Sequence, residues 1–265
     1  MIKILRKGYE MEQGKIIYIC ENTPDGVFTA IYDAWAARIA DERLNIIVDG
    51  DYTFELFAEY RYVETDMEKA VKVARSVSRK ISSEAYRQMY TASLSHEEDK
   101  IMAIYRFLKL GFRVGAAVTD MHGRDEVCRV FELCRNVSNE ACSFREFLRF
   151  AELENGILLA RIRPKNFVLP LIAGHFADRF PEENFAIVDD TAQMGVFHER
   201  GKKWFLSPVD SEAIRRLWNS ERSQEYERLW KLFFRTIAIE ERRNYRCQRT
   251  LCALRYRDYM LEFDR

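Results

Sequence analysis

The chain has 265 residues, of which 48% are hydrophobic, so it can bury a core as large as that of one big domain or of two joined ones. Its 42 basic residues are balanced by 42 acidic ones, which excludes a global positive field that would draw it to nucleic acid or to an anionic membrane. Any binding surface for a polyanion must therefore be local.

The six cysteines are scattered, without a Cys-x-x-Cys pair or a tight cluster with histidines, so we expect neither a metal site nor a bound cofactor. No apolar run approaches the ~18 residues of a membrane span, and the first residues lack the apolar core and cleavage site of a secretion signal. We therefore expect a soluble, cytoplasmic protein that contacts no membrane.

The first elements alternate between strand and helix. Ile16–Cys20 is an apolar run too short for a helix, and it predicts a buried strand. After the chain-breaking residues of segment 22–26, apolar residues recur at helical spacing from Val27 to Ile39. A second short strand is expected at Ile46–Val48. This strand, loop and helix unit can start a parallel or mixed sheet.

Helices are expected to dominate as far as about Asn139. Apolar spacing predicts helices over Asp66–Ile81 and over roughly Asp125–Cys134. Between them, Ser95 and Glu98 match a Ser-x-x-Glu capping box, which predicts that a helix begins there.

Asn155-Gly156 is the strongest hairpin signal in the chain, because both residues tolerate the positive φ that a type I′ turn requires. It predicts strands over Phe144–Leu153 and Ile157–Arg163. The apolar residues of the first segment also fit helical spacing, but the turn requires a partner strand, so we expect a strand here.

The register of this hairpin decides how its arginines are arranged. With a two-residue loop, Arg145 and Arg149 lie on the opposite side of the sheet from Arg161 and Arg163. With a loop one residue longer, all of them gather around Phe147 as a basic aromatic platform that can bind phosphates and stack bases. Two-residue loops are the favoured form of hairpin, so we expect the first register.

Apolar spacing from Leu169 to Phe180 predicts a helix with Pro170 in its first turn. Short strands are expected further on, at Phe185–Val188, Gly195–His198 and Trp204–Leu206. The hairpin, the helix and this meander predict an α+β fold with an antiparallel or mixed sheet, a helical N-terminal part and a helical C-terminal arm.

We divide the chain into an N-terminal strand–helix region, residues 1–90, and a main α+β domain with the C-terminal arm, residues 91–265. The two regions are expected to be closely packed or to form one continuous domain.

The end of the C-terminal arm is rich in arginine interleaved with tyrosine, and only Glu240 and Glu241 oppose these charges locally. Such a local excess in a neutral chain favours contact with phosphate. The alternative is an arginine-rich helix whose side chains extend over the sheet. The arginines concerned are Arg235, Arg242, Arg243, Arg246, Arg249, Arg255 and Arg257.

Three segments carry a family resemblance: Ile16–Trp35, the stretch from Phe144 to Phe180, and Leu229–Phe263. The most specific motifs are Phe147-Leu148-Arg149-Phe150, Arg163-Pro164-Lys165 and His175-Phe176-Ala177-Asp178-Arg179-Phe180. Together the segments resemble a little-characterised bacterial family assigned to DNA metabolism or DNA repair. The resemblance implies an accessory role beside a radical-SAM protein of DNA modification or repair. A related domain is fused to uracil-DNA glycosylase, but the active-site motifs of that enzyme are absent from this sequence.

Our leading hypothesis is an accessory protein that holds DNA for a partner enzyme. The candidate nucleic-acid-binding residues are Arg145, Arg149, Arg161, Arg163, Lys165, Arg242, Arg243, Arg246, Arg249, Arg255 and Arg257. The first alternative is an enzyme that acts on DNA, with acid/base or metal-binding candidates His175, Asp178, Asp189, Asp190 and His198. The second is a protein partner of the radical-SAM enzyme without direct contact to DNA.

Overall fold

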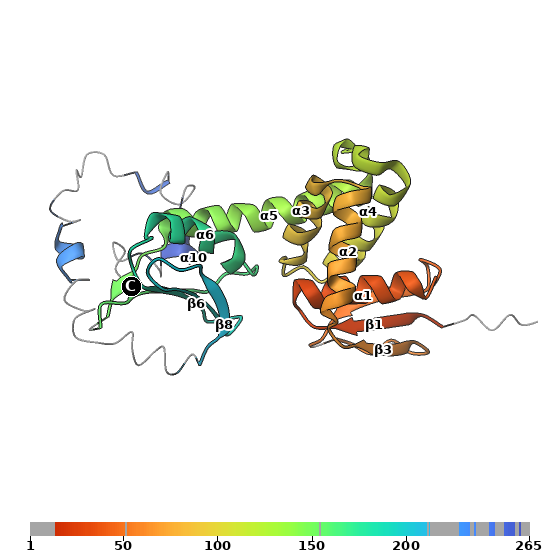
Figure 1. Cartoon of the computed structure of the whole chain (residues 1–265), viewed down its shortest axis with the longest axis horizontal. Coiled ribbons are helices and arrows are strands. Elements are labelled where there is room, and N and C mark those ends of the chain that lie inside the picture. Colours follow the sequence, from red (N-terminus) through yellow and green to blue (C-terminus); the bar gives the residue numbers. More distant parts are fainter. Residues whose placement is uncertain are drawn as a thin grey trace, which may run out of the picture. The chain divides into compact units, whose positions relative to one another are not determined.

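The computed structural model describes residues 14–50, 52–153, 155–210, 212, 228–233, 236, 244–246, 252–257 and 260. The chain divides into two compact units between Cys134 and Arg135, and each unit has its own sheet (Figure 1). None of the helices in these residues is long and apolar enough to cross a membrane. The division expected near residue 90 falls inside helix α3 (Ser83–Ser93), whose buried residues belong to the core of the first unit.

Strand β1 (Ile16–Cys20) lies at the centre of the first sheet, between β2 (Leu44–Val48) and β3 (Glu59–Val63). Both neighbours pair with it in parallel. All residues of β1 are buried, which explains its continuous apolar run. The predicted strands at β1 and β2 are confirmed. No strand is predicted at β3, because that edge strand lacks an apolar run and none of its residues is fully buried.

The first unit also contains helices α1 (Pro24–Ala36) and α2 (Met67–Lys80), which pack against each other (Figure 1). Both helices are as predicted. Thr23 caps α1 by accepting a hydrogen bond from the Gly26 N–H at 3.0 Å. Asp66 caps α2 by accepting hydrogen bonds from two backbone N–H groups of its first turn. The remaining elements are α3, α4 (Lys100–Val114) and the 3₁₀ helix η1 (Gly115–Asp120).

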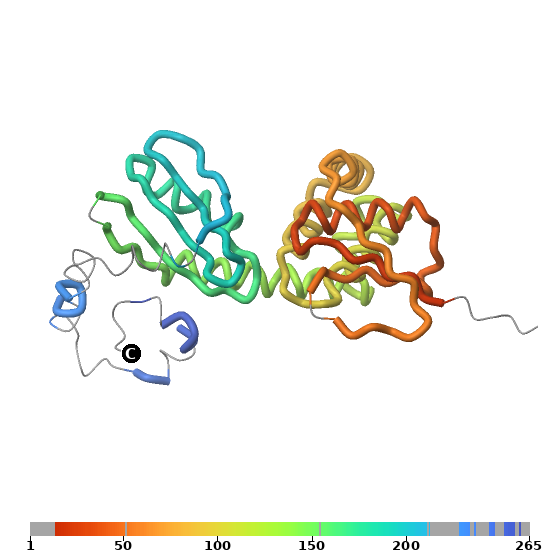
Figure 2. The backbone as a smooth tube through the Cα atoms, turned by 90° about the horizontal axis from the view of Figure 1, so that it is seen from below, coloured from red at the N-terminus to blue at the C-terminus, as the bar shows by residue number. Residues whose placement is uncertain are grey.

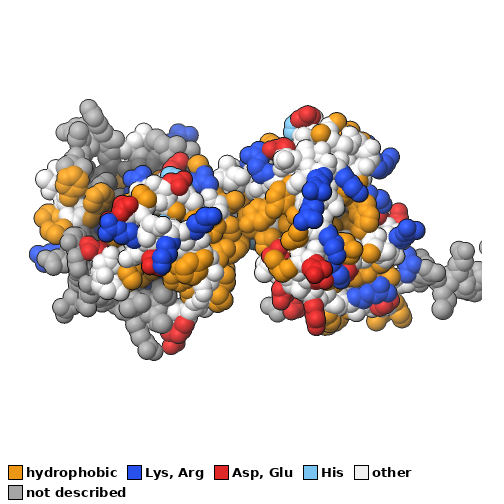
Figure 3. Space-filling model, in the orientation of Figure 1, with side chains coloured by type: hydrophobic (Ala, Val, Ile, Leu, Met, Phe, Trp, Pro, Cys, Tyr) orange, Lys and Arg blue, Asp and Glu red, His pale blue; other side chains and the backbone are white. Residues whose placement is uncertain are grey.

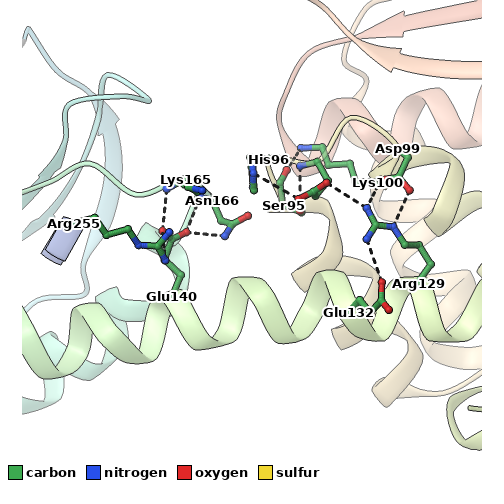
Figure 4. Close-up of polar contacts among 11 residues, drawn as sticks. Ser95, His96, Asp99, Lys100, Arg129, Glu132, Glu140, Lys165, Asn166 and Arg255 are labelled. Carbon is green, nitrogen blue, oxygen red and sulfur yellow. Dashed lines mark hydrogen bonds and ion pairs between the residues drawn. The ribbon is translucent and has the colours of Figure 1, made fainter. Parts of the chain in front are cut away.

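The capping box predicted at Ser95 is wrong, because α4 begins only at Lys100. Ser95 Oγ accepts the Glu97 N–H within a local turn instead. The buried Lys100 Nζ donates to Ser95 O at 2.7 Å and to Asn22 Oδ1 at 2.6 Å. Asp99, at the start of α4, is held by an ion pair with Arg129 at 2.6 Å and makes no side-chain cap (Figure 4).

Helix α5 (Asp125–Phe147) is longer than the predicted helix and crosses the division between the units. The strand predicted over Phe144–Leu153 is therefore wrong. Phe144 lies on α5 and is buried, and only β4 (Ala151–Glu152) is extended. Ala141, Phe144 and Leu148 are spaced as on one face of a helix, and all three pack in one core. This packing favours the helix over the long strand that the Asn-Gly turn predicts.

The second unit is built on a five-stranded sheet with the order β4-β5-β6-β7-β8 (Figure 2). Its strands after β4 are β5 (Leu158–Ile162), β6 (Phe185–Asp189), β7 (Met194–His198) and β8 (Phe205–Pro208). Strands β5 and β6 are parallel, and the other neighbours are antiparallel. The fold is thus α+β, with one parallel and one mixed sheet rather than a purely antiparallel one.

The parallel pairing of β5 and β6 follows from the helix between them. Helix α6 (Leu169–Arg179) returns the chain from the end of β5 to the end of the sheet at which β5 begins, so that β6 can start beside it and run parallel. The predicted helix and the position of Pro170 in its first turn are confirmed. The meander β6-β7-β8 is also as predicted.

The hairpin of β4 and β5 has the longer of the two loops considered. Ala151 pairs with Leu159, and the Leu153 N–H donates to the Ile157 carbonyl at 2.9 Å, so the expected two-residue loop is wrong. Gly156 has φ of 79°, which suits a glycine. The basic aromatic platform does not follow from this register, because Arg145 lies on α5 and not on a strand.

Much of the C-terminal arm, including Arg235, Arg242, Arg243 and Arg249, lies outside the described residues. Within them, α10 (Leu254–Arg257) contributes Tyr256 to the core of the second unit. The ring of Tyr256 meets the ring of Phe144 edge-on, with a centroid separation of 5.2 Å.

Candidate functional site

Polar residues gather at the carboxyl ends of β5 and β6, the edge of a parallel pair where open sheets commonly bind ligands. Strand β5 continues into the loop that holds Arg163 and Lys165, and β6 continues into Asp190. The Asp190 N–H donates to the Ile162 carbonyl at 3.0 Å, which ties the two strand ends together. We call this region the β5/β6 edge; it consists of Arg161, Arg163, Lys165, Asp189, Asp190, Glu140 and Arg255.

Asp190 binds two arginines, Arg161 on β5 and Arg163 in the loop that follows it. Arg161 binds it through two nitrogen atoms, with the shorter contact, Nη2 to Oδ2, at 2.6 Å. Arg163 binds the same oxygen through Nε at 3.1 Å. The side chain of Arg161 is only 15% exposed and that of Asp190 11%, whereas that of Arg163 is 59% exposed. The ion pair therefore positions Arg163 while much of its side chain remains exposed.

Glu140 of α5 holds the loop between β5 and α6. Its buried carboxylate accepts hydrogen bonds from the backbone N–H groups of Lys165 and Asn166, at 3.0 and 2.8 Å, and from the Asn166 side chain at 2.7 Å (Figure 4). Arg255 approaches the same carboxylate at 3.6 Å. The Lys165 side chain is exposed, so the loop presents an ammonium group from a fixed backbone.

Arg255 is held from a second side by its neighbour Tyr256. Its Nη2 donates to the Tyr256 hydroxyl at 2.6 Å, and its guanidinium carbon lies 4.8 Å from the centre of that ring. Such contacts restrict the guanidinium while leaving the side chain 48% exposed.

Asp189 is almost fully buried, and its Oδ1 accepts the backbone N–H groups of Thr191 and Ala192 at 2.8 and 3.1 Å. Burial raises the pKa of this carboxyl to about 6, against the opposing effect of the two hydrogen bonds, and the charges of Asp190 and Glu140 raise it further. The group mainly closes the turn after β6.

The five candidates for catalysis are not brought together. His198 pairs with Phe185 at the start of β6, whereas Asp189 and Asp190 are at its end, roughly 13 Å along the strand. The His198 ring stacks on Phe185 with a centroid distance of 4.8 Å, and its Nδ1 lies 2.9 Å from the Glu183 carbonyl. His175 and Asp178 are exposed on α6. Among the described residues, no group of three or more His, Cys, Asp or Glu side chains is arranged to hold a metal ion.

The candidates for nucleic-acid binding are not all at the β5/β6 edge. Arg161 and Arg163 lie there around Asp190, and Lys165 and Arg255 lie there around Glu140. Arg145 instead donates to the Leu171 carbonyl, and Arg149 donates to carbonyls at the end of α5. Of the others, Arg246 and Arg257 are among the described residues, and Arg242, Arg243 and Arg249 lie outside them.

Glu140 is a site residue that sequence reasoning missed, although a signal for it exists. Val130, Leu133, Val137 and Phe144 are all buried and follow one another at steps of three, four and seven residues. Glu140 occupies the remaining position of this apolar series, at the spacing of the core-facing side of a helix. A carboxylate at such a position requires partners, which here are the N–H groups of the β5–α6 loop.

The comparisons place this edge within a known family of domains. The family model described as "Domain of unknown function (DUF4130)" matches residues 98–262, a span that includes every residue of the β5/β6 edge. No curated protein matches the chain.

Proposed function

We propose that this chain, which belongs to the DUF4130 family of domains of unknown function, is an accessory protein of DNA metabolism that binds DNA phosphates through the β5/β6 edge. From its resemblance to DNA-metabolism proteins, it would act beside a partner enzyme of the radical-SAM class. The partner supplies the chemistry, and this chain holds the nucleic acid.

The observation that carries the proposal is that buried carboxylates position exposed cations. Asp190 and Glu140 have side-chain exposures of 11% and 2%, whereas Arg163 and Arg255 have 59% and 48%. The negative charges therefore lie inside the edge and the positive charges at its surface. An arginine held in place loses less conformational entropy when its planar group binds a phosphate.

Phosphate contacts of this kind position a protein on DNA without reading its sequence. The edge offers two arginine forks and the point charge of Lys165, which suits oxygen atoms of the backbone. We therefore expect salt-sensitive binding with little sequence preference.

The test compares two double variants of the full chain by DNA binding over a range of salt concentrations. Arg163→Ala with Lys165→Ala removes two cations from the β5/β6 edge. Arg200→Ala with Lys202→Ala removes two exposed cations that pair with Glu182 and Glu199 beyond the other end of the sheet. Log K for duplex DNA falls as log salt rises, and each phosphate that a cation neutralises contributes about −0.9 to this slope. The first variant should therefore make the slope shallower by roughly 2.

The control variant should keep the slope of the unmodified protein. Equal losses in the two variants would show diffuse attraction and remove the β5/β6 edge from the proposal. Failure of the unmodified protein to bind single- or double-stranded DNA at ~50 mM salt would reject DNA binding altogether. Co-purification with a partner enzyme that survives nuclease treatment would then favour a protein interface.

A further inference from the structure

A second candidate site lies in the first unit and shares no residue with the β5/β6 edge. A cavity of about 450 Å³ opens between α1, α2 and α4. This volume is within the roughly 300–1,000 Å³ usual for small-molecule sites. Its walls combine aromatic rings from α1 and α4 with lysines from α2.

Trp35 forms the aromatic wall and is 40% exposed, which is high for so large an apolar side chain. Its ring is held by Phe112 at a centroid distance of 5.3 Å and an interplanar angle of 67°, and by Tyr105 at 5.8 Å and 60°. Because both neighbours meet the indole at steep angles, neither ring stacks flat on it. The indole is thus fixed in position and can still receive a planar ligand.

The opposite wall is basic. Lys72, Ser76 and Lys80 line the cavity from one face of α2, since they are spaced by four residues, and the two lysines are ~12 Å apart along the helix axis. None of the described residues that line the cavity carries a carboxylate. Glu68 lies 3.7 Å from Lys72 in an exposed pair, which is worth little in water.

Helix α2 as a whole supports this charge. Its sequence, MEKAVKVARSVSRK, holds five basic residues against one acidic residue. Lysine and arginine side chains follow the helix beside exposed hydrophobic groups on the face seen in Figure 3. The cavity therefore combines a flat apolar surface with a positive rim, which complements a planar aromatic group that carries negative charge.

We propose that this cavity binds a nucleotide, with the base against Trp35 and phosphate groups at Lys72 and Lys80. Stacking on an aromatic side chain accepts any base, and an ammonium group binds phosphate as a point charge. The spacing of the lysines favours a ligand with more than one phosphate. Two sources share this chemistry: a free nucleoside polyphosphate and consecutive units of single-stranded nucleic acid. The inference does not rest on the function proposed for the β5/β6 edge.

The test measures binding of the full chain to ATP without metal, to a short oligothymidylate, to inorganic triphosphate and to adenosine. We expect the first or the second to bind well and the last two to bind at least tenfold more weakly, because each lacks either the base or the phosphates. Preference for ATP would identify a free nucleotide as the ligand, and preference for the oligonucleotide a single strand.

Matched variants locate the site. Lys72→Ala with Lys80→Ala should weaken binding by tenfold or more, whereas Arg75→Ala with Arg79→Ala, on the same helix but outside the cavity lining, should change it by less than about twofold. Trp35→Leu should weaken binding by roughly tenfold, and Trp35→Phe should restore much of it. Thermal unfolding of each variant shows that the unit remains folded.

Equal losses in the two double variants, or binding of inorganic triphosphate as tight as that of ATP, would reduce the cavity to a basic surface and overturn the inference. No binding of either base-bearing ligand would overturn it as well. The Arg163→Ala, Lys165→Ala variant should keep ATP binding intact. Failure at one site is therefore distinguishable from failure at the other.

Discussion

Asp189 is a buried carboxyl of the second unit whose ionisation affects stability. Its carboxyl has an ordinary pKa of 3.8, and burial raises this pKa to about 6 in the folded chain. Between these two pH values the folded state binds more protons than the unfolded state, so the free energy of unfolding falls as the pH rises through this window. At neutral pH the penalty is complete and amounts to roughly 3 kcal/mol at 1.36 kcal/mol for each pKa unit.

Replacement of Asp189 by Asn should therefore stabilise the chain at pH 7. The amide oxygen can still accept the Thr191 and Ala192 N–H groups, and no charge is buried. We expect a gain of roughly 1–2 kcal/mol, because a buried amide donor offsets part of the penalty. Urea unfolding at pH 7 and at pH 4 measures the effect, which should be nearly lost at the lower pH.

The neighbouring Asp190 provides the control for this prediction. It is ion-paired with Arg161 and Arg163, so Asp190→Asn should destabilise the chain at pH 7 rather than stabilise it. A loss of stability in Asp189→Asn at pH 7 would contradict the prediction and would mean that the charged form is needed by the turn after β6.

At the scale of single elements, the stability of α2 depends on its N-cap residue, Asp66. Asp66 Oδ1 accepts the N–H groups of Glu68 and Lys69, which have no partner within the helix. Asp66→Ala should lower the free energy of unfolding by about 1 kcal/mol, and Asp66→Asn by only a few tenths, since asparagine caps almost as well. Denaturant unfolding of both variants tests this. Equal stability of the alanine variant and the unmodified chain would show that the cap is dispensable.

The elements predicted correctly from the sequence are those with local signals. Ile16–Cys20 is a short apolar run in a central strand, and the helix from Leu169 has one apolar face with proline in its first turn. The errors arise where distant contacts decide. Phe144 fits both a strand and a helix, and its packing in the second core selects the helix. The parallel pairing of β5 with β6 joins residues separated by a whole helix, which no short pattern specifies.

In the candidate site, too, local features are predicted correctly and contacts between distant residues are not. Arg161 and Arg163 are candidates from the sequence, because arginines in a short apolar segment and directly after it are visible as a local feature. The sequence instead predicts their common partner Asp190 as a member of an acid/base set, since sequence distance does not show that the two strand ends adjoin. Arg145 and Arg149 are expected from the sequence side by side on a strand over Phe144–Leu153, and this arrangement is wrong because that strand is absent. Arg145 instead donates to a carbonyl of α6.

At the scale of the whole molecule, α5 is the element that both units share. Val127, Val130 and Leu133 belong to the core of the first unit, and Ala141 and Phe144 belong to that of the second. The buried positions of α5 thus continue on both sides of the division, with Glu140 as the charged member of an otherwise apolar series. Broken in the middle, the helix would leave two pieces of about ten residues, a length at which isolated helices are marginal.

Asn136 is exposed on α5 next to the division, so it can be replaced without disturbing either core. Asn136→Pro should cost about 3 kcal/mol or more, because proline removes a helical hydrogen bond and clashes with the preceding turn. Asn136→Gly should cost a few tenths of a kcal/mol, and Asn136→Ala should slightly stabilise the chain. Denaturant unfolding gives these energies, and hydrogen exchange should show faster exchange in α5 on both sides of position 136 in the proline variant. A proline variant within about 1 kcal/mol of the unmodified chain would mean that each core holds its own part of α5 independently.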